Sequence, residues 1–255
     1  MKRIAIVACV HGNEPYGLEV GKNLPSSCSF FIANEKALRE NKRFIDTDLN
    51  RCFPGKIDGN HEEYLAYQLT KNLKSFDYVI DLHSTPQNCE MFGILTKPNK
   101  EKMRLAKLLG LKRIVIMTQE YASGKALIDV VECGISLEIG PHQSNEISKQ
   151  ALAAINNLTE KREVENQVFE SYEVFCIIRG KISNVCMNNF QEVKKGQSIA
   201  VQEDGSQQKA TFDFVPVLVG KKAYSDVICL ACKKILFESY KAPFKVHIEH
   251  LISIL

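Results

Sequence analysis

The chain has 255 residues, of which 45% are hydrophobic and 25% are charged, so it can bury a substantial core. Its formal net charge of +3 is too small for the concentrated basic face of proteins that bind nucleic acid or membrane surfaces. No apolar run in the sequence approaches the length that crosses a bilayer. We therefore expect one large domain, or a main domain with a small one, and neither a nucleic-acid nor a membrane partner.

The first expected element is a buried strand at residues 3–10. Its apolar run of about seven residues is at the lower limit for a signal peptide, and the polar segment His11-Gly-Asn-Glu14 follows where a small-residue cleavage site would lie. The 9 cysteines are odd in number and scattered. We expect reduced thiols and a cytoplasmic location.

Strand and helix patterns then alternate up to about residue 158. Helices are expected after Pro15, after the capping box of Asn60 and Glu63, around residues 105–109 and at residues 147–158. Short apolar segments predict further strands at residues 30–33, 78–82, 114–117 and 135–139. This alternation predicts a three-layer α/β domain with a mainly parallel or mixed sheet.

The pattern changes in the last third of the chain. Residues 159–168 are charged and indicate the end of a helix or a linker. Apolar residues at alternate positions then predict a strand with four side chains on one face, namely Tyr172, Val174, Cys176 and Ile178. Glycines recur at hairpin-like intervals, at positions 180, 196, 205 and 220. These features predict a small all-β domain.

Cys229 and Cys232 form a CxxC pair, which is typical of redox or zinc sites. No second such pair accompanies them in the sequence, and they lie in an expected strand. A spacing of three residues directs two strand side chains to opposite faces. We interpret them as buried structural cysteines.

Potential metal ligands follow two of the expected strands. His11 and Glu14 lie three residues apart in the turn after the first strand, and His83 ends the strand at residues 78–82. Each alone is more often a solvated or structural group, but together they offer three ligands and one open position, the format of a catalytic zinc site. Asp81 either orients an imidazole or caps a turn. Of the other histidines, His142 could line the site, although a surface position is favoured. His61 opens an expected helix, and His247 and His250 lie in the C-terminal tail.

A carboxylate and two arginines could complete a reaction. Glu138 lies inside an apolar strand, as an ion-paired residue or as a general base. Arg43 and Arg51 flank a loop rich in hydrogen-bonding groups. They are either solvated or able to clamp a carboxylate and stabilise an oxyanion.

Taken together, the segments His11–Glu14, 43–51, 81–83 and 138–141 resemble the aspartoacylase/succinylglutamate desuccinylase family of zinc carboxypeptidase-like hydrolases, and lean toward the aspartoacylase branch. The resemblance implies a catalytic domain at residues 1–160 with a zinc-carboxypeptidase-like fold, and a C-terminal β domain at residues 165–255 that covers the active site.

The resemblance also implies individual roles. One Zn²⁺ per chain would be bound by His11, Glu14 and His83. Glu138 would be the general base, and Arg43 would polarise the scissile carbonyl. The substrate would be held by Asn50, Arg51 and Tyr224.

One departure concerns the substrate. The aspartoacylase branch has a further substrate-binding arginine about ten residues before the catalytic glutamate, whereas here Lys125 is the nearest cation, and lysine lacks the bidentate geometry of arginine.

We expect hydrolysis of the amide of a small N-acyl amino acid that bears a carboxylate, by a chain that could form a homo-oligomer. The alternatives are desuccinylation of succinylglutamate, trimming of a small peptide, and a metal-binding protein without catalysis. Intact Glu138 and Arg43 argue against the last of these.

Overall fold

The computed structural model describes residues 2–118, 124–142, 144, 146–161, 168–220 and 226–236. Within these ranges, five α-helices are present: α1 (Gly17–Lys22), α2 (Glu35–Arg39), α3 (His61–Leu73), α4 (Lys100–Leu108) and α6 (Glu146–Thr159). Two 3₁₀ turns, η1 (Leu49–Arg51) and η2 (Leu127–Asp129), lie in the connecting loops.

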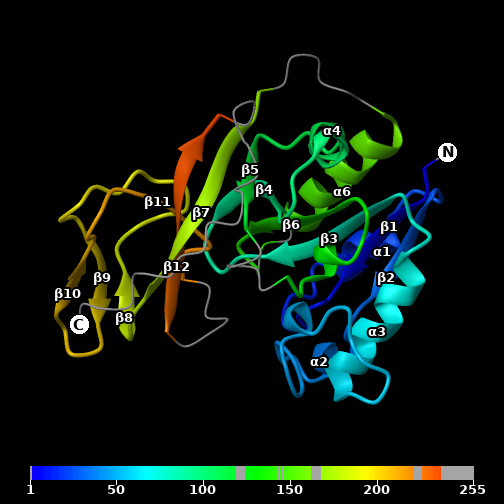
Figure 1. Ribbon diagram of the computed structural model, residues 1–255, viewed down its shortest axis with the longest axis horizontal. Coiled ribbons are helices and arrows are strands. Elements are labelled where there is room, and N and C mark those ends of the chain that lie inside the picture. Colours follow the sequence, from blue (N-terminus) through cyan, green and yellow to red (C-terminus); the bar gives the residue numbers. More distant parts are fainter. Residues whose placement is uncertain are drawn as a thin grey trace, which may run out of the picture.

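The main sheet contains both the first strand along the chain and the last described one (Figure 1). Its strands are β1 (Ile4–Ala8), β2 (Cys28–Ile32), β3 (Tyr78–Ser84), β4 (Cys89–Leu95), β5 (Arg113–Ile116), β6 (Gly134–Gly140), β7 (Glu170–Arg179), β11 (Val215–Val217) and β12 (Val227–Ile235). Their order across the sheet is β11-β12-β7-β5-β4-β6-β3-β1-β2. A second, antiparallel sheet has the order β10-β9-β8, from β8 (Ile182–Val185), β9 (Ser198–Gln202) and β10 (Gln207–Lys209).

The main sheet is mixed, as the alternation of strands and helices predicted. Strands β2, β1, β3 and β6 pair in parallel, and β4 runs antiparallel to β6. β7 then pairs in parallel with β5, so the C-terminal strands continue the sheet of the first part of the chain. β4 was not predicted, because Glu90 and Gly93 interrupt the apolar residues of its segment CEMFGIL.

Hydrophobic clusters cover both faces of this sheet. In β1, Ile4, Ile6 and Ala8 join one cluster with residues of α1, α4 and α6. Ala5 and Val7 of the same strand join another cluster with residues of α3. Burial on both faces explains why the strand is apolar throughout. The result is the predicted three-layer arrangement.

One expectation about β7 is wrong. Tyr172 and Val174 pack in the same cluster as α3, whereas Cys176 and Ile178 pack against a third cluster beneath the small sheet. The pairing of β7 with β12 shifts register between Val174 and Cys176. A bulge of this kind changes the strict alternation of side chains, so the four residues do not share a face.

The prediction that Cys229 and Cys232 are buried structural cysteines is confirmed. All nine cysteines of the chain are free thiols. Cys229 and Cys232 are buried in β12 and belong to different hydrophobic clusters, as opposite faces of one strand require. Burial raises the pKa of Cys229 to about 12. Burial also raises the pKa of Cys232 well above its usual value, so neither thiol has the thiolate character of a redox cysteine.

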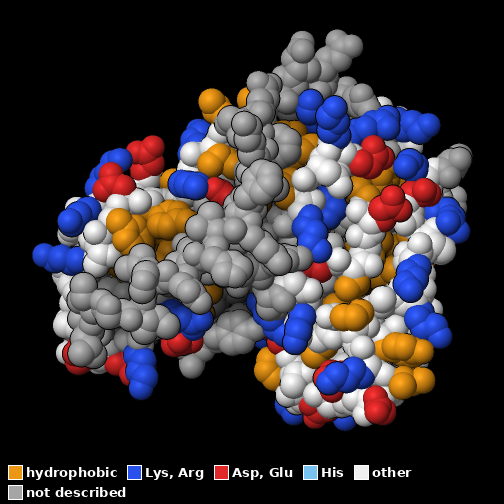
Figure 2. Space-filling view, in the orientation of Figure 1, with side chains coloured by type: hydrophobic (Ala, Val, Ile, Leu, Met, Phe, Trp, Pro, Cys, Tyr) orange, Lys and Arg blue, Asp and Glu red, His pale blue; other side chains and the backbone are white. Residues whose placement is uncertain are grey.

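The surface is consistent with the composition. Figure 2 shows lysine and arginine side chains interspersed with acidic ones over the visible face. No helix of the described residues combines the length and apolar character that a membrane span requires.

Candidate metal centre and active site

The turn after β1 carries His11 and Glu14. The backbone N–H of Glu14 donates to the carbonyl of His11 at 3.1 Å, which folds the two residues toward each other. Gly12 lies between them against α2, where a Cβ would collide with the backbone of Ala37. His83 lies near the carboxyl end of β3, the parallel neighbour of β1, so all three side chains meet at one edge of the sheet.

The three side chains form a compact donor set. Their ligand-type atoms lie within 4.8 Å of one another, and each residue is 2% exposed. Nδ1 of His11 lies 3.0 Å from Oε1 of Glu14, and Nδ1 of His83 lies 3.3 Å from Oε2. Two imidazole nitrogens and a carboxylate are a common ligand set for catalytic zinc. These residues therefore fit a metal ion.

Each imidazole is oriented by a further buried carboxylate. Nε2 of His11 lies 3.2 Å from Oδ1 of Asp48, and Nε2 of His83 lies 2.7 Å from Oδ2 of Asp81. An N–H held at Nε2 leaves Nδ1 of each ring facing Glu14, as a metal ligand requires. Asp81 thus orients an imidazole, one of the two roles considered from the sequence.

These contacts also set the protonation of the centre. Burial lowers the pKa of His83, but the charge of Asp81 and hydrogen bonds to Asp81 and Glu14 raise it to about 10. Burial raises the pKa of Asp48, yet the hydrogen bond and charge of His11, with the charge of Arg43, hold it well below its usual value. Asp48 therefore stays ionised beside His11 and Arg43. Sequence reasoning missed Asp48, although its place before Leu49 is typical of a helix cap.

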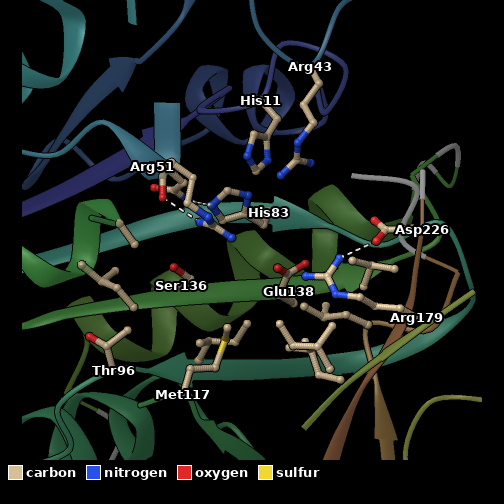
Figure 3. Close-up of a pocket in the computed structure, with 18 residues that line it drawn as sticks. His11, Arg43, Arg51, His83, Thr96, Met117, Ser136, Glu138, Arg179 and Asp226 are labelled. Carbon is tan, nitrogen blue, oxygen red and sulfur yellow. Dashed lines mark hydrogen bonds and ion pairs between the residues drawn. The ribbon is translucent and has the colours of Figure 1, made fainter. Parts of the chain in front are cut away.

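Arg43 is held by the acids of the same centre. Its Nε and Nη2 donate to Oδ2 of Asp48 at 3.2 and 2.9 Å, and Nη1 lies 3.6 Å from Oε1 of Glu14. Its side chain is 16% exposed. In Figure 3 the guanidinium lies beside the ring of His11. This arrangement places a fixed positive charge next to the proposed metal ligands.

The loop between Arg43 and Arg51 is anchored by Glu62 of α3. The buried carboxylate of Glu62 accepts hydrogen bonds from the backbone N–H groups of Ile45, Asp46 and Thr47 at 2.7 to 3.2 Å. Burial raises the pKa of Glu62, but these donors and the amide of Asn34 outweigh it and lower the pKa. The loop is therefore positioned by a side chain outside the active site.

Asn50 and Arg51 follow in the turn η1. Asn50 is buried, and its Oδ1 accepts a hydrogen bond from the N–H of Leu127 at 3.0 Å. Arg51 donates from Nη1 to the carbonyl of Asn50 at 2.7 Å. Both residues line the cavity that also exposes His11 and His83. The Arg43–Arg51 loop thus brings three polar side chains to one cavity.

Glu138 lies on β6, directly opposite His83 in the parallel pairing with β3. It is 3% exposed, and its side chain lines the cavity. In Figure 3 its carboxylate lies on the same side of the sheet as the His83 ring. The structure thus places a buried carboxylate on the strand next to the metal ligands, as general-base chemistry needs.

The cavity has a volume of about 330 Å³. Besides its polar side chains it has an aliphatic wall, formed by Ile94, Met117, Ala126, Ile128, Ile177, Leu218, Val227 and Leu230. Arg179, the last residue of β7, and Asp226, directly before β12, also line the cavity and form an ion pair, with Nη1 and Oδ2 2.7 Å apart (Figure 3). Sequence reasoning missed this pair, because it depends on which ends of β7 and β12 meet.

Two other candidate residues, His142 and Lys125, do not line this cavity among the described residues. His142 lies outside it, with Nδ1 2.7 Å from Oγ of Ser84. Lys125 is exposed and is not among the lining residues. Tyr224 lies outside the described residues, so its predicted contact with the substrate stays a prediction.

Known proteins resemble this chain in sequence and in fold. A family model described as the succinylglutamate desuccinylase/aspartoacylase catalytic domain matches residues 1–162. A probable aspartoacylase of Acaryochloris marina is 32% identical over 55% of this chain and 56% of its own. An N-acyl-aromatic-L-amino acid amidohydrolase of Danio rerio is 26% identical over 54% of each chain.

The chain thus matches just over half of the length of these two relatives. The crystal structure of murine aminoacylase 3 superposes with a TM-score of 0.77 over 92% of this chain and 95% of that one, at 20% identity. The fold is therefore shared over nearly the whole length.

Proposed function

Because this chain belongs to the succinylglutamate desuccinylase/aspartoacylase family, we propose that it is a zinc-dependent hydrolase that cleaves the amide bond of a small N-acyl amino acid. The observation that carries this proposal is the meeting of a buried His11–Glu14–His83 donor set with Glu138 at one cavity. A protein that only binds a metal does not need a buried carboxylate on the strand beside the ligands. The family relatives support the acyl amino acid as substrate.

A metal ion bound by His11, Glu14 and His83 supplies Lewis-acid chemistry, which polarises a carbonyl and acidifies water. Asp48 and Asp81 fix the ring orientations of His11 and His83, so that both rings can bind the metal ion.

Glu138 and Arg43 perform the remaining steps at the amide. Glu138 accepts a proton from the attacking water and later delivers it to the leaving nitrogen, so the bond breaks to give a carboxylate and a free amino acid. Arg43 lines the same cavity, and its positive charge stabilises the oxyanion that develops on the carbonyl oxygen.

Asn50 and Arg51 bind the α-carboxylate of the substrate. Arg51 has planar N–H donors that match a carboxylate, and its backbone neighbour Asn50 is fixed by Leu127. The C-terminal region, with Tyr224, restricts the mouth of the cavity. A volume of about 330 Å³ suits a short acyl amino acid better than a peptide chain.

The proposal is tested by hydrolysis of a panel of acetyl-, formyl- and succinyl-amino acids with the protein stripped of metal and reloaded with zinc. We expect activity on at least one substrate, lost on stripping and restored by zinc. In Glu138→Gln, which keeps the shape of the side chain but cannot accept the proton, we expect turnover to fall by about a hundred- to ten-thousand-fold. A folded, zinc-loaded Glu138→Gln protein with near-normal turnover would show that Glu138 is not the base.

A further inference from the structure

A second hollow lies close to the metal ligands and is lined mainly by polar side chains. Its lining includes Tyr16 from the segment between β1 and α1, Ser148 of α6, and His142 from the segment after β6. Among the described residues, it shares no lining residue with the active-site cavity. Tyr16 and His142 nevertheless reach groups at the metal ligands, each by a different route.

Tyr16 contacts the metal ligand His83 directly. Its side chain is buried, and its hydroxyl donates to the main-chain carbonyl of His83 at 3.1 Å. The register of β1 with β3 runs from Tyr78 to Asp81, so His83 lies beyond the pairing of these two strands. The carbonyl of Tyr16 accepts a hydrogen bond from the hydroxyl of Ser148 at 3.2 Å. Tyr16 therefore connects α6 to the end of β3 where the support of β1 has ended.

His142 reaches the metal ligand Glu14 through Ser84. Nδ1 of His142 lies 2.7 Å from Oγ of Ser84, and the backbone N–H of Ser84 donates to Oε2 of Glu14 at 2.8 Å. Ser84 is fully buried. The backbone N–H of His142 also donates to the carbonyl of Thr85 at 3.0 Å. The segment after β6 is thus bound to the two residues that follow His83, and one of these holds the carboxylate of Glu14.

We propose that Tyr16 and His142 are positioning residues of the metal centre. They fix the end of β3 from outside the active-site cavity, and with it the separation of the ligands His83 and Glu14. Nδ1 of His83 and Oε2 of Glu14 lie 3.3 Å apart, and both depend on this strand end. The inference rests on the proposed function, because it concerns the metal ion that these ligands would bind.

The physical effect is preorganisation of the ligand atoms. A metal ion binds most tightly when its ligands are already held near their bound positions, and hydrogen bonds around the ligands supply this order. The net contribution of one ordinary hydrogen bond corresponds to about a three- to tenfold change in an equilibrium constant. Because neither Tyr16 nor His142 lines the active-site cavity, their loss should affect the metal ion and kcat rather than KM.

Three variants of the full chain test the two contacts. In Tyr16→Phe and in His142→Ala, the Kd for zinc, measured by competition with a chromogenic chelator, should rise by about three- to tenfold. His142→Asn should recover much of the affinity, because its amide group can take the place of Nδ1 beside the hydroxyl of Ser84. At saturating zinc, kcat on the best substrate should fall in the first two variants while KM stays the same.

Tyr78→Phe is the matched control. Tyr78 is a buried tyrosine at the amino end of the same strand β3, and its hydroxyl donates to Glu101 at 2.6 Å. The same chemical group is removed there, but far along the strand from His83, so the Kd for zinc should not change. Co²⁺ gives a second readout, because its visible absorption reports the geometry of its ligands. The spectrum of the Co²⁺-loaded protein should shift in Tyr16→Phe and His142→Ala but not in Tyr78→Phe.

The results separate this inference from the proposed function. If zinc binds but no acyl amino acid is hydrolysed, the proposed function fails, and the comparison of Kd values still tests the positioning role. If Tyr16→Phe and His142→Ala match Tyr78→Phe in zinc Kd and in Co²⁺ spectrum, only the positioning role is wrong, even where their Tm values fall. Equal losses of affinity in His142→Ala and His142→Asn would overturn the route through Ser84. A wild-type chain that binds no zinc would overturn both proposals.

Discussion

At the scale of single residues, the site depends on where charges are fixed. Asp48 contacts Nε2 of His11, and Asp81 contacts Nε2 of His83. Nδ1 of each ring therefore faces Glu14. The ligand types and their spacing could be predicted from the sequence, since His11, Glu14 and His83 follow two parallel strands. Asp48 could not be assigned, because its contact with His11 spans 37 positions and depends on the path of the loop.

Arg51 gives a prediction at this scale. If Arg51 binds the α-carboxylate, Arg51→Ala should lower kcat/KM on an N-acetylamino acid by about tenfold or more, since a charge-assisted bond is lost. The same substrate with its α-carboxylate converted to the amide should lose much less. The measurement is kcat/KM on both substrates for wild type and variant. An equal loss on the two would mean that Arg51 supports the fold or the oxyanion.

At the scale of elements, the helix α3 sets the geometry of the Arg43–Arg51 loop. Its capping box was predicted from Asn60 and Glu63, and both of its hydrogen bonds are present. No pattern in the sequence indicated that Glu62, one residue before Glu63, accepts hydrogen bonds from the backbone of the loop. Helical periodicity indicates which face is apolar, but it does not show which buried acid will find backbone donors.

Glu62 has a predictable pH dependence. Its folded-state pKa is lowered, so its contribution to stability is present above its unfolded pKa of about 4.5 and is lost as the pH falls through the folded value. Glu62→Gln should cost roughly 1–3 kcal/mol at pH 7, because its amide group faces N–H donors. The difference from wild type should shrink below about pH 4.5.

Chemical denaturation of both proteins from pH 7 to pH 3 measures this difference. Glu63→Gln is a useful comparison, because Glu63 caps the same helix through Asn60, whereas the backbone N–H groups of residues 45–47 donate to Glu62. A stability difference for Glu62→Gln that does not change with pH would argue against the carboxylate as the origin of the effect.

At the scale of the whole molecule, β7, β11 and β12 extend the same sheet that holds the metal ligands. The apolar strands and the mixed sheet were predictable from patterns that are local in sequence. The joining of β7 to β5 was not, because strand pairing between distant segments leaves no periodic signal. The same limit hid the Arg179–Asp226 pair and the bulge in β7.

Arg113 of β5 connects the first part of the main sheet to β7. It donates from Nε to Glu170 of β7 at 2.8 Å, and its guanidinium lies 4.9 Å from the ring centroid of Phe190. Arg113→Met keeps an apolar chain but removes the charge, and should cost about 1 kcal/mol, or roughly 2–4 °C in Tm. Lys112→Met, at an exposed neighbouring position, should change Tm by less. Equal Tm values for the two variants would contradict a joining role for Arg113.

The measurement that tests the central claim most directly is the zinc content of the purified full chain, determined by elemental analysis together with hydrolytic activity, in wild type and in His83→Ala. One bound zinc per chain and active wild-type protein are expected, since His11, Glu14 and His83 form the ligand group found among the described residues. His83→Ala should lose most of its zinc and its activity while remaining folded. A His83→Ala protein with full zinc content and full activity would contradict the metal centre and the mechanism built on it.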